Sequence, residues 1–156
     1  MLIVQLKGKV GGFDQEEIND FYARYDDLSD LEVPFDEDVC KSQFNNAKKY
    51  LLELEGNGSI VTKYANDFTN LYSLWAIVCL NNDKLPNPSG FAARYSAFME
   101  EVGKYKNAEY YASVINSSMT SFISATTKYY QNSTGASTEP PQREGRHEAL
   151  VSAIFQ

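Results

Sequence analysis

The feature that most constrains how this chain folds is the segment 70–80, NLYSLWAIVCL, which is its most apolar window. The segment contains the only tryptophan, Trp75, and one of the two cysteines, Cys79. Read as a helix, it is apolar around most of its circumference, and helices of that kind are buried by neighbours on several sides. The sequence therefore predicts a central buried helix over 69–81, with the other helices packed around it.

The remaining apolar residues recur mostly at helical spacing. Ile18, Phe21 and Tyr25, for example, follow one another at intervals of three and four residues, as on one face of an amphipathic helix. Asp14 and Glu17 stand three residues apart just before them, in a capping-box pattern. Alternation with a period of two is nowhere sustained, which argues against a sheet. The sequence therefore predicts an all-α fold.

At 156 residues the chain has the length of one domain, and 43% of its residues are hydrophobic, enough to form a core. We expect a single-domain bundle of six to seven helices spanning 1–156. The expected segments are 1–7 (a helix or a short strand), 14–26, 36–55, the central 69–81, a helix over 91–102 capped by Ser89, one long helix over 107–131 and a terminal helix over 141–155, with a short apolar piece at 60–65. Residues 27–35 are expected to form a loop, and the low-complexity stretch 132–141 a mobile loop before the terminal helix.

The chain is acidic, with 21 acidic against 14 basic residues and a net charge of −7. Eleven of the acidic residues fall within 14–38. This balance opposes non-specific attraction to nucleic-acid phosphates or to anionic lipid, and no segment has the length needed to span a membrane. The two cysteines, Cys40 and Cys79, stand alone on apolar stripes, so we expect buried free thiols and a reducing cytoplasm.

Residue types that carry catalysis or bind cofactors are few. The only histidine is His147, and neither a serine elbow nor a phosphate-binding loop pattern is present. No ligand set has a recognised metal spacing, and Asp26, Asp27 and Asp30 are predicted to form a solvated acidic loop rather than a weak cation site. We expect no cofactor, no metal and no enzymatic activity; a small enzyme that uses carboxylates or His147 is the alternative.

The start of the terminal helix is a short cationic window that contains Arg143, Arg146 and His147. Free N–H groups at a helix N-terminus favour anions, so these side chains form a candidate contact for phosphate or nucleic acid. The alternative is structural, with arginines paired to acidic neighbours on another helix and a histidine exposed to solvent. Any contact with nucleic acid is expected to be weak and salt-sensitive, because the rest of the chain is acidic.

In the order of its segments the chain resembles a known family. The segments that carry the resemblance are LIVQLKGKV, INDFYARYD, KKYLLELEG, DFTNLYSLWAIVCLNNDKLPN and REGRHEALVSAIF. Three points within them are the most specific. They are Phe21-Tyr22 with Tyr25, the segment from Asp67-Phe68 to Leu74 followed by Asp83-Lys84-Leu85-Pro86, and Arg143 with Arg146. They resemble the helical C-terminal half of the GmrSD-type family of restriction and phage-defence proteins, which carry a ParB/sulfiredoxin-like nuclease domain. The Asp-Gly-Gln-Gln-Arg motif of that nuclease domain is absent from this sequence, so the resemblance implies no catalytic residue here.

Together these observations predict a non-catalytic accessory or interaction domain. Its partner would be another protein or the missing nuclease domain, as in a truncated or split subunit of a restriction-type system. The second interpretation is a stand-alone interaction module that forms a homodimer. Leu2, Ile3, Val4 and Leu6 would then form an exposed apolar strip, unless another chain or domain covers them.

Overall fold

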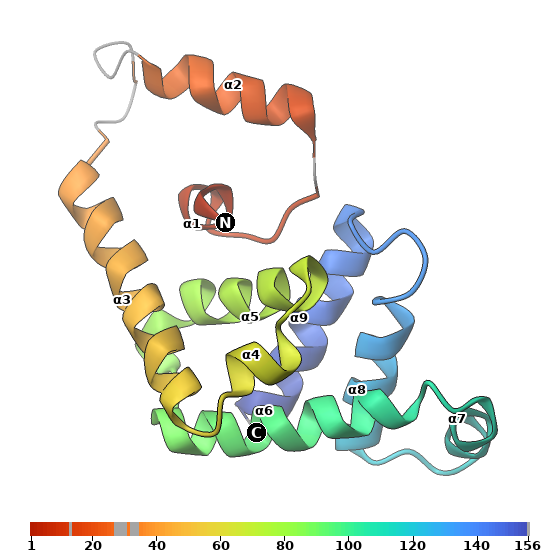
Figure 1. The fold of residues 1–156 in the computed structure, drawn as a ribbon. Coiled ribbons are helices and arrows are strands. Elements are labelled where there is room, and N and C mark those ends of the chain that lie inside the picture. Colours follow the sequence, from red (N-terminus) through yellow and green to blue (C-terminus); the bar gives the residue numbers. More distant parts are fainter. Residues whose placement is uncertain (13, 27–30, 32–34, 156) are drawn as a thin grey trace.

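The computed structural model describes residues 1–12, 14–26, 31 and 35–155, and all regular structure in these ranges is helical. The helices are α1 (Leu2–Lys7), α2 (Gln15–Asp26), α3 (Glu37–Gly56), α4 (Ile60–Tyr64), α5 (Phe68–Leu80), the 3-10 turn η2 (Asn82–Lys84), α6 (Pro88–Lys104), α7 (Ala108–Ile115), α8 (Ser121–Gln131) and α9 (Pro140–Ile154). They form one all-α domain, which confirms the predicted fold class (Figure 1). Most of the predicted loop 27–35, including Asp27 and Asp30, lies outside the described residues.

Helix α5 is the centre of the domain. Its residues Ser73–Val78 are all buried, and α1, α3 and α9 pack against it (Figure 1). Asp67 caps the helix, because its carboxylate accepts a hydrogen bond from the Asn70 amide at 2.8 Å. The predicted central helix 69–81 is therefore confirmed. At 13 residues α5 is too short for a bilayer, and no other helix in the described ranges could cross one.

The C-terminal helices complete the core around α5. Helices α8 and α9 pack along each other, and α6 packs against both (Figure 1). Phe98 of α6 meets Tyr129 of α8 edge-on, with ring centroids 5.3 Å apart, which is a favourable aromatic geometry. The Tyr129 hydroxyl donates to Asn70 Oδ1 at 2.7 Å. This bond ties α8 to the first turn of α5.

The single long helix predicted over 107–131 is wrong, because the chain breaks at 116–120 into α7 and α8. Asn116 and Ser117 donate from their side chains to backbone carbonyls of the preceding turn, each at 2.8 Å. Thr120 then caps the new helix α8 by accepting a backbone amide at 3.2 Å. Short polar side chains compete with helical backbone bonds in this way, so a local cluster of them ends one helix and starts another.

Two finer expectations also need correction. The cap of α6 is Asn87 rather than Ser89, and Asn87 accepts the Gly90 amide at 2.8 Å. The reason is Pro88, which fits the first helical position and makes the preceding residue the cap. Met119, which falls inside the long helix predicted over 107–131, lies in the break and is exposed.

Helices α1 and α2 lie at one edge of the domain, with α1 between α2 and α5 (Figure 1). Residues 2–7 are helical, so the short-strand alternative is wrong. Val4 is buried, Ile3 and Leu6 are half-buried, and Leu2 is exposed. The expected exposed strip is therefore divided between the core and the surface.

Candidate functional site

Arg146 of the predicted anion contact lies inside the protein, with only 1% of its surface exposed. Its Nε donates to Ser73 Oγ at 3.0 Å, and its Nη1 donates to the carbonyls of Asn132 and Ser137 at 2.5 and 2.9 Å. Its hydrogen-bond partners are thus a hydroxyl and two carbonyls, rather than the carboxylates of the structural alternative. A side chain in this position has almost no surface to offer a phosphate.

Arg143 is the second member of the cationic window, and it holds the loop that follows α1. Its guanidinium lies 4.1 Å from the centroid of the Tyr72 ring, and its Nη1 donates to the Gly11 carbonyl at 3.0 Å. The Tyr72 hydroxyl donates to the same carbonyl, also at 3.0 Å. A stacked and hydrogen-bonded guanidinium of this kind is a structural clamp, which draws the loop onto α5 and α9.

His147, expected at the surface, is half-buried. Its Nδ1 is enclosed and has no hydrogen-bond partner among the described residues. Burial lowers the pKa of His147, and the neighbouring Glu148 carboxylate opposes that shift. The correction follows from tertiary packing, since Gly8, Lys9 and Val10 of the loop after α1 line a cavity together with His147.

Two adjoining cavities lie beside the loop after α1, and they share Gly8, Leu80 and Asn81 in their walls. The larger measures about 410 Å³ and is otherwise lined by Gln5, Gln43, Cys79, Asn82, Asp83 and Lys84. The smaller measures about 350 Å³ and contains His147 with Glu144 and Glu148 in its wall. Both are large enough for a small polar molecule.

These cavities do not bring a nucleophile and a base together. His147 lines one of them and Cys79 lines the other. Burial raises the pKa of the Cys79 thiol to about 12, so the thiol is protonated at neutral pH and is a poor nucleophile.

Cys79 and Cys40 are both free and half-buried, so they are less buried than predicted. In the described ranges no group of three or more His, Cys, Asp or Glu side chains is placed to hold a metal ion.

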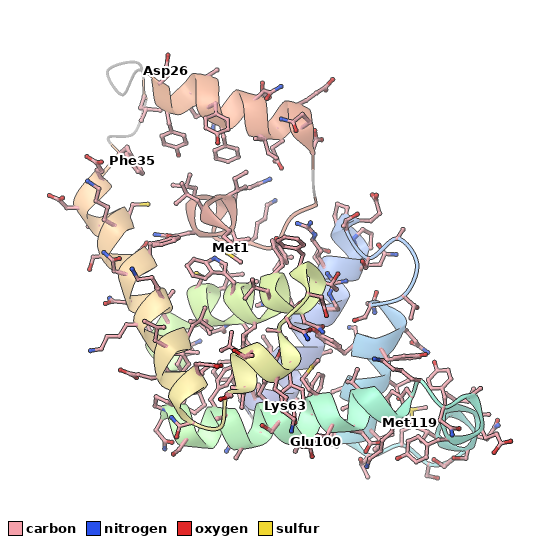
Figure 2. All side chains as sticks on the ribbon, in the orientation of Figure 1. Met1, Asp26, Phe35, Lys63, Glu100 and Met119 are labelled. Atoms are coloured by element: carbon pink, nitrogen blue, oxygen red, sulfur yellow. The ribbon has the colours of Figure 1, made fainter. Side chains whose placement is uncertain are left out.

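The feature that sequence reasoning missed is the incomplete covering of α2. This helix is 12 residues long, yet none of its residues is buried. Its apolar row of Ile18, Phe21 and Tyr25 is only half-buried, and the Phe21 and Tyr25 rings stack with centroids 6.0 Å apart. Tyr25 also meets Phe35 edge-on at 5.1 Å. Phe35 lies near the Asp26 end of α2, so the row continues toward the start of α3 (Figure 2).

Helix α1 lies beneath this row. Successive residues of an α-helix are rotated by about 100°, so Leu2 and Leu6 lie on the side of α1 opposite the buried Val4. Because α1 lies between α2 and α5 (Figure 1), Leu2 and Leu6 face α2. Leu2 nevertheless remains 48% exposed. An ion pair between Lys7 and Glu17 joins the two helices at one end, and Leu6, Ile18, Phe21 and Tyr25 along the seam are half-buried.

We define the α2 face as the apolar surface that these helices share. It comprises Leu2, Leu6, Ile18, Phe21, Tyr22, Tyr25, Phe35 and Val39, of which Tyr22 is 76% and Val39 50% exposed. The segment 14–38, which contributes most of these residues, is acidic. Within 14–38 the described residues include the acids Asp14, Glu16, Glu17, Asp20, Asp26, Asp36, Glu37 and Asp38, against one basic side chain, Arg24.

No protein-family model, curated protein or solved structure matches this chain. The comparisons therefore show no family, and the resemblance to the GmrSD-type family stays a prediction. The candidate site therefore rests on the geometry of the chain itself. In that geometry the α2 face is an apolar surface that the described residues cover only in part.

Proposed function

We propose that this domain is a non-catalytic interaction module that binds a partner protein through the α2 face. The observation that carries the proposal is an amphipathic helix of 12 residues with an aromatic row and no buried residue. Burial of apolar surface is favourable by about 25 cal/mol per Å², and contiguous exposed apolar surface marks interaction sites. A partner seated on the α2 face supplies the burial that the chain itself does not.

The other two roles have less support from the geometry. Nucleic-acid contact through the cationic window is disfavoured, because Arg146 is buried and Arg143 is stacked on Tyr72. A homodimer through the α2 face is disfavoured by charge, since a twofold contact brings the same carboxylates of two copies together. A partner of different sequence fits better than a second copy.

The resemblance to restriction-type proteins adds one candidate for that partner, a nuclease domain on a separate chain. We also place the domain in the cytoplasm, a proposal that agrees with two cysteines that are both free. Neither point is needed for the interaction itself, which depends only on the exposed and half-buried residues of α1, α2 and the start of α3.

Photo-crosslinking in the cells that produce the protein tests the proposal. A photoreactive phenylalanine derivative replaces Tyr22, which is exposed beside the row. The matched control carries the same group in place of Leu52, which is 65% exposed and lies about 22 Å along α3 from its first turn. We expect one defined protein, identified by mass spectrometry, to be captured from position 22 and not from position 52.

Each of the other results has a defined meaning. Capture of the chain's own copy from position 22 supports the homodimer and contradicts a hetero-partner. Equal capture from positions 22 and 52, or capture from neither, overturns the α2 face as an interaction site.

A further inference from the structure

We propose that the two adjoining cavities beside the loop after α1 bind a free α-amino acid with a polar side chain. Its ammonium and carboxylate groups occupy the larger cavity, and its side chain extends into the smaller one. The larger cavity is lined by residues of α1, α3 and the end of α5, and none of them belongs to the α2 face. The inference is therefore independent of the proposed interaction with a partner protein.

The larger cavity contains one charged side chain of each sign. Asp83 and Lys84 follow each other in η2, and both line the cavity. Neither forms an ion pair with another described residue. The last turn of α5 ends at the same cavity, and the C-terminus of a helix carries partial negative charge. A ligand with an ammonium beside a carboxylate satisfies both side chains, whereas a simple anion or cation satisfies only one of them.

Two amide side chains in the wall of the larger cavity are held in a fixed orientation. Gln43 Oε1 accepts from Gln5 Nε2 at 3.2 Å, and the same Gln5 nitrogen donates to the Cys40 carbonyl at 2.7 Å. Asn81 Nδ2 donates to the Ile77 carbonyl at 3.0 Å. The amide of Gln43 therefore keeps its N–H donors for a ligand, and the amide of Asn81 keeps its carbonyl acceptor.

These amides give each charged end of the ligand a second contact. We assign the ligand carboxylate to the Lys84 ammonium and the N–H donors of Gln43. The ligand ammonium is assigned to the Asp83 carboxylate and the carbonyl oxygen of Asn81. Hydrogen bonds in which one group is charged are the strong ones, and amides that are already oriented lose little freedom on binding.

The smaller cavity fits a polar side chain on the ligand. It shares Asn81 with the larger cavity, and Lys9, Glu144 and His147 are in its wall. Burial lowers the pKa of His147, so its ring is neutral at pH 7 and contains one donor and one acceptor nitrogen. An apolar side chain would remove such groups from water without giving them a partner, which costs free energy. A polar side chain forms hydrogen bonds with them instead.

Titration of the full chain with individual amino acids tests the inference. The probes are L-glutamine, L-glutamate and L-arginine, and L-leucine is the apolar control. We expect calorimetry to give a dissociation constant on the order of 100 µM for at least one polar probe, as for a ligand of about ten non-hydrogen atoms. Leucine should bind at least about tenfold more weakly. The N-acetyl form of the bound probe lacks the ammonium and its α-amide lacks the carboxylate, so each should also bind at least about tenfold more weakly.

Variants of the chain assign the binding to the larger cavity. Asp83→Asn and Lys84→Met should each weaken the bound probe at least about tenfold, because each leaves one charged end of the ligand without its partner. Asp38→Asn and Lys48→Met remove the same charges from exposed positions of α3 outside both cavities, and they should leave the binding unchanged. Asp83 and Lys84 are exposed, so the fold should survive both changes, and circular dichroism checks that it does.

Several results would overturn the inference. If no polar probe binds at about 10 mM, about a hundredfold above the expected dissociation constant, the cavities hold no free amino acid. If the N-acetyl form and the amide bind as tightly as the amino acid, recognition of the paired charges is wrong. If Asp83→Asn and Lys84→Met bind as their controls do, the site lies elsewhere, and equal binding of leucine would contradict the role of the smaller cavity. None of these results bears on the crosslink from Tyr22, which lies outside both cavities.

Discussion

Arg146 of α9 donates from Nε to the hydroxyl of Ser73 in α5 at 3.0 Å, so a buried guanidinium joins the last helix to the central one. The same side chain holds the carbonyls of Asn132 and Ser137, which lie in the stretch that joins α8 to α9. One residue thereby fixes the connection between α8 and α9 against the centre of the domain. Among the described residues Arg146 is the most buried arginine, and the fold uses it for packing.

Replacing Arg146 with lysine should lower the free energy of unfolding by about 3 kcal/mol. Lysine keeps the charge, but its single ammonium group cannot reach the Ser73 hydroxyl and two separate carbonyls as the guanidinium does. Urea denaturation followed by circular dichroism measures the change. Arg24→Lys on exposed α2 is the control and should stay within about 0.5 kcal/mol of the native chain. A loss for Arg146→Lys no larger than that of the control would contradict the structural role.

How far the sequence predicts this fold depends on how local the deciding interactions are. The central helix was predicted because α5 is apolar on nearly every side, which is a property of the sequence alone. The break between α7 and α8 was missed because Asn116 and Ser117 bond to their own preceding turn. Apolar spacing alone does not show when such side chains displace the helical backbone bonds.

The candidate site was harder to predict for a tertiary reason. The partners of Arg146 are Ser73, far away in the sequence, and carbonyls that every residue carries, so no pattern of residue types identifies them. For the α2 face the residue pattern is visible in the sequence, and the tertiary arrangement around it is not. The sequence identifies the amphipathic helix correctly, but whether Phe21 and Tyr25 are covered depends on where α1 and α3 lie.

Gly145→Ala should destabilise the domain by about 1–2 kcal/mol. A β-carbon at Gly145 would lie 2.7 Å from Cγ of Asn132, whose side-chain amide donates to the Lys128 carbonyl at 2.8 Å. The Asn132 side chain must therefore move and lose that bond. In an Asn132→Ala background the same change should cost at least about 1 kcal/mol less. Additive losses in urea denaturation would contradict the clash.

Gly103→Ala is the matched control for that substitution. It also places a β-carbon on a helical glycine, but no atom lies within 4 Å of the new carbon. Alanine loses less conformational freedom than glycine on folding, so this variant should be more stable by about 0.5 kcal/mol. The two glycines should thus change stability in opposite directions.

The domain should lose stability as the pH falls through the range in which His147 titrates. Burial lowers the pKa of His147 in the folded state, so the unfolded chain, with a pKa of about 6.5, binds the proton more readily. The stability contributed by neutral His147 is therefore complete above about pH 6.5 and declines below it, by at most about 1.4 kcal/mol per pH unit. His147→Gln should flatten the dependence of unfolding free energy on pH between 7.5 and 5.5.

The carboxylates with a lowered pKa do not add to the change in unfolding free energy between pH 7.5 and 5.5. Glu148 beside His147, like Glu55 and Glu100, has a pKa lowered by its hydrogen bonds. A lowered carboxyl pKa contributes stability that is lost only below the unfolded value of about 4.3. An unchanged slope in His147→Gln between pH 7.5 and 5.5 would show that the histidine is not desolvated.

Cys79 should react slowly with alkylating reagents in the folded chain. Burial raises its pKa to about 12, so only about one thiol in ten thousand is ionised at pH 8, against about a quarter for a free cysteine. In a Cys40→Ala variant, which leaves Cys79 as the only thiol, iodoacetamide should react at least about a hundredfold more slowly in buffer than in urea. The rate should also rise about tenfold per pH unit from pH 8 to 10, since only the thiolate reacts. A rate that levels off near pH 8 would reveal an activated thiolate beside the cavities and would favour the enzymatic alternative over the interaction module.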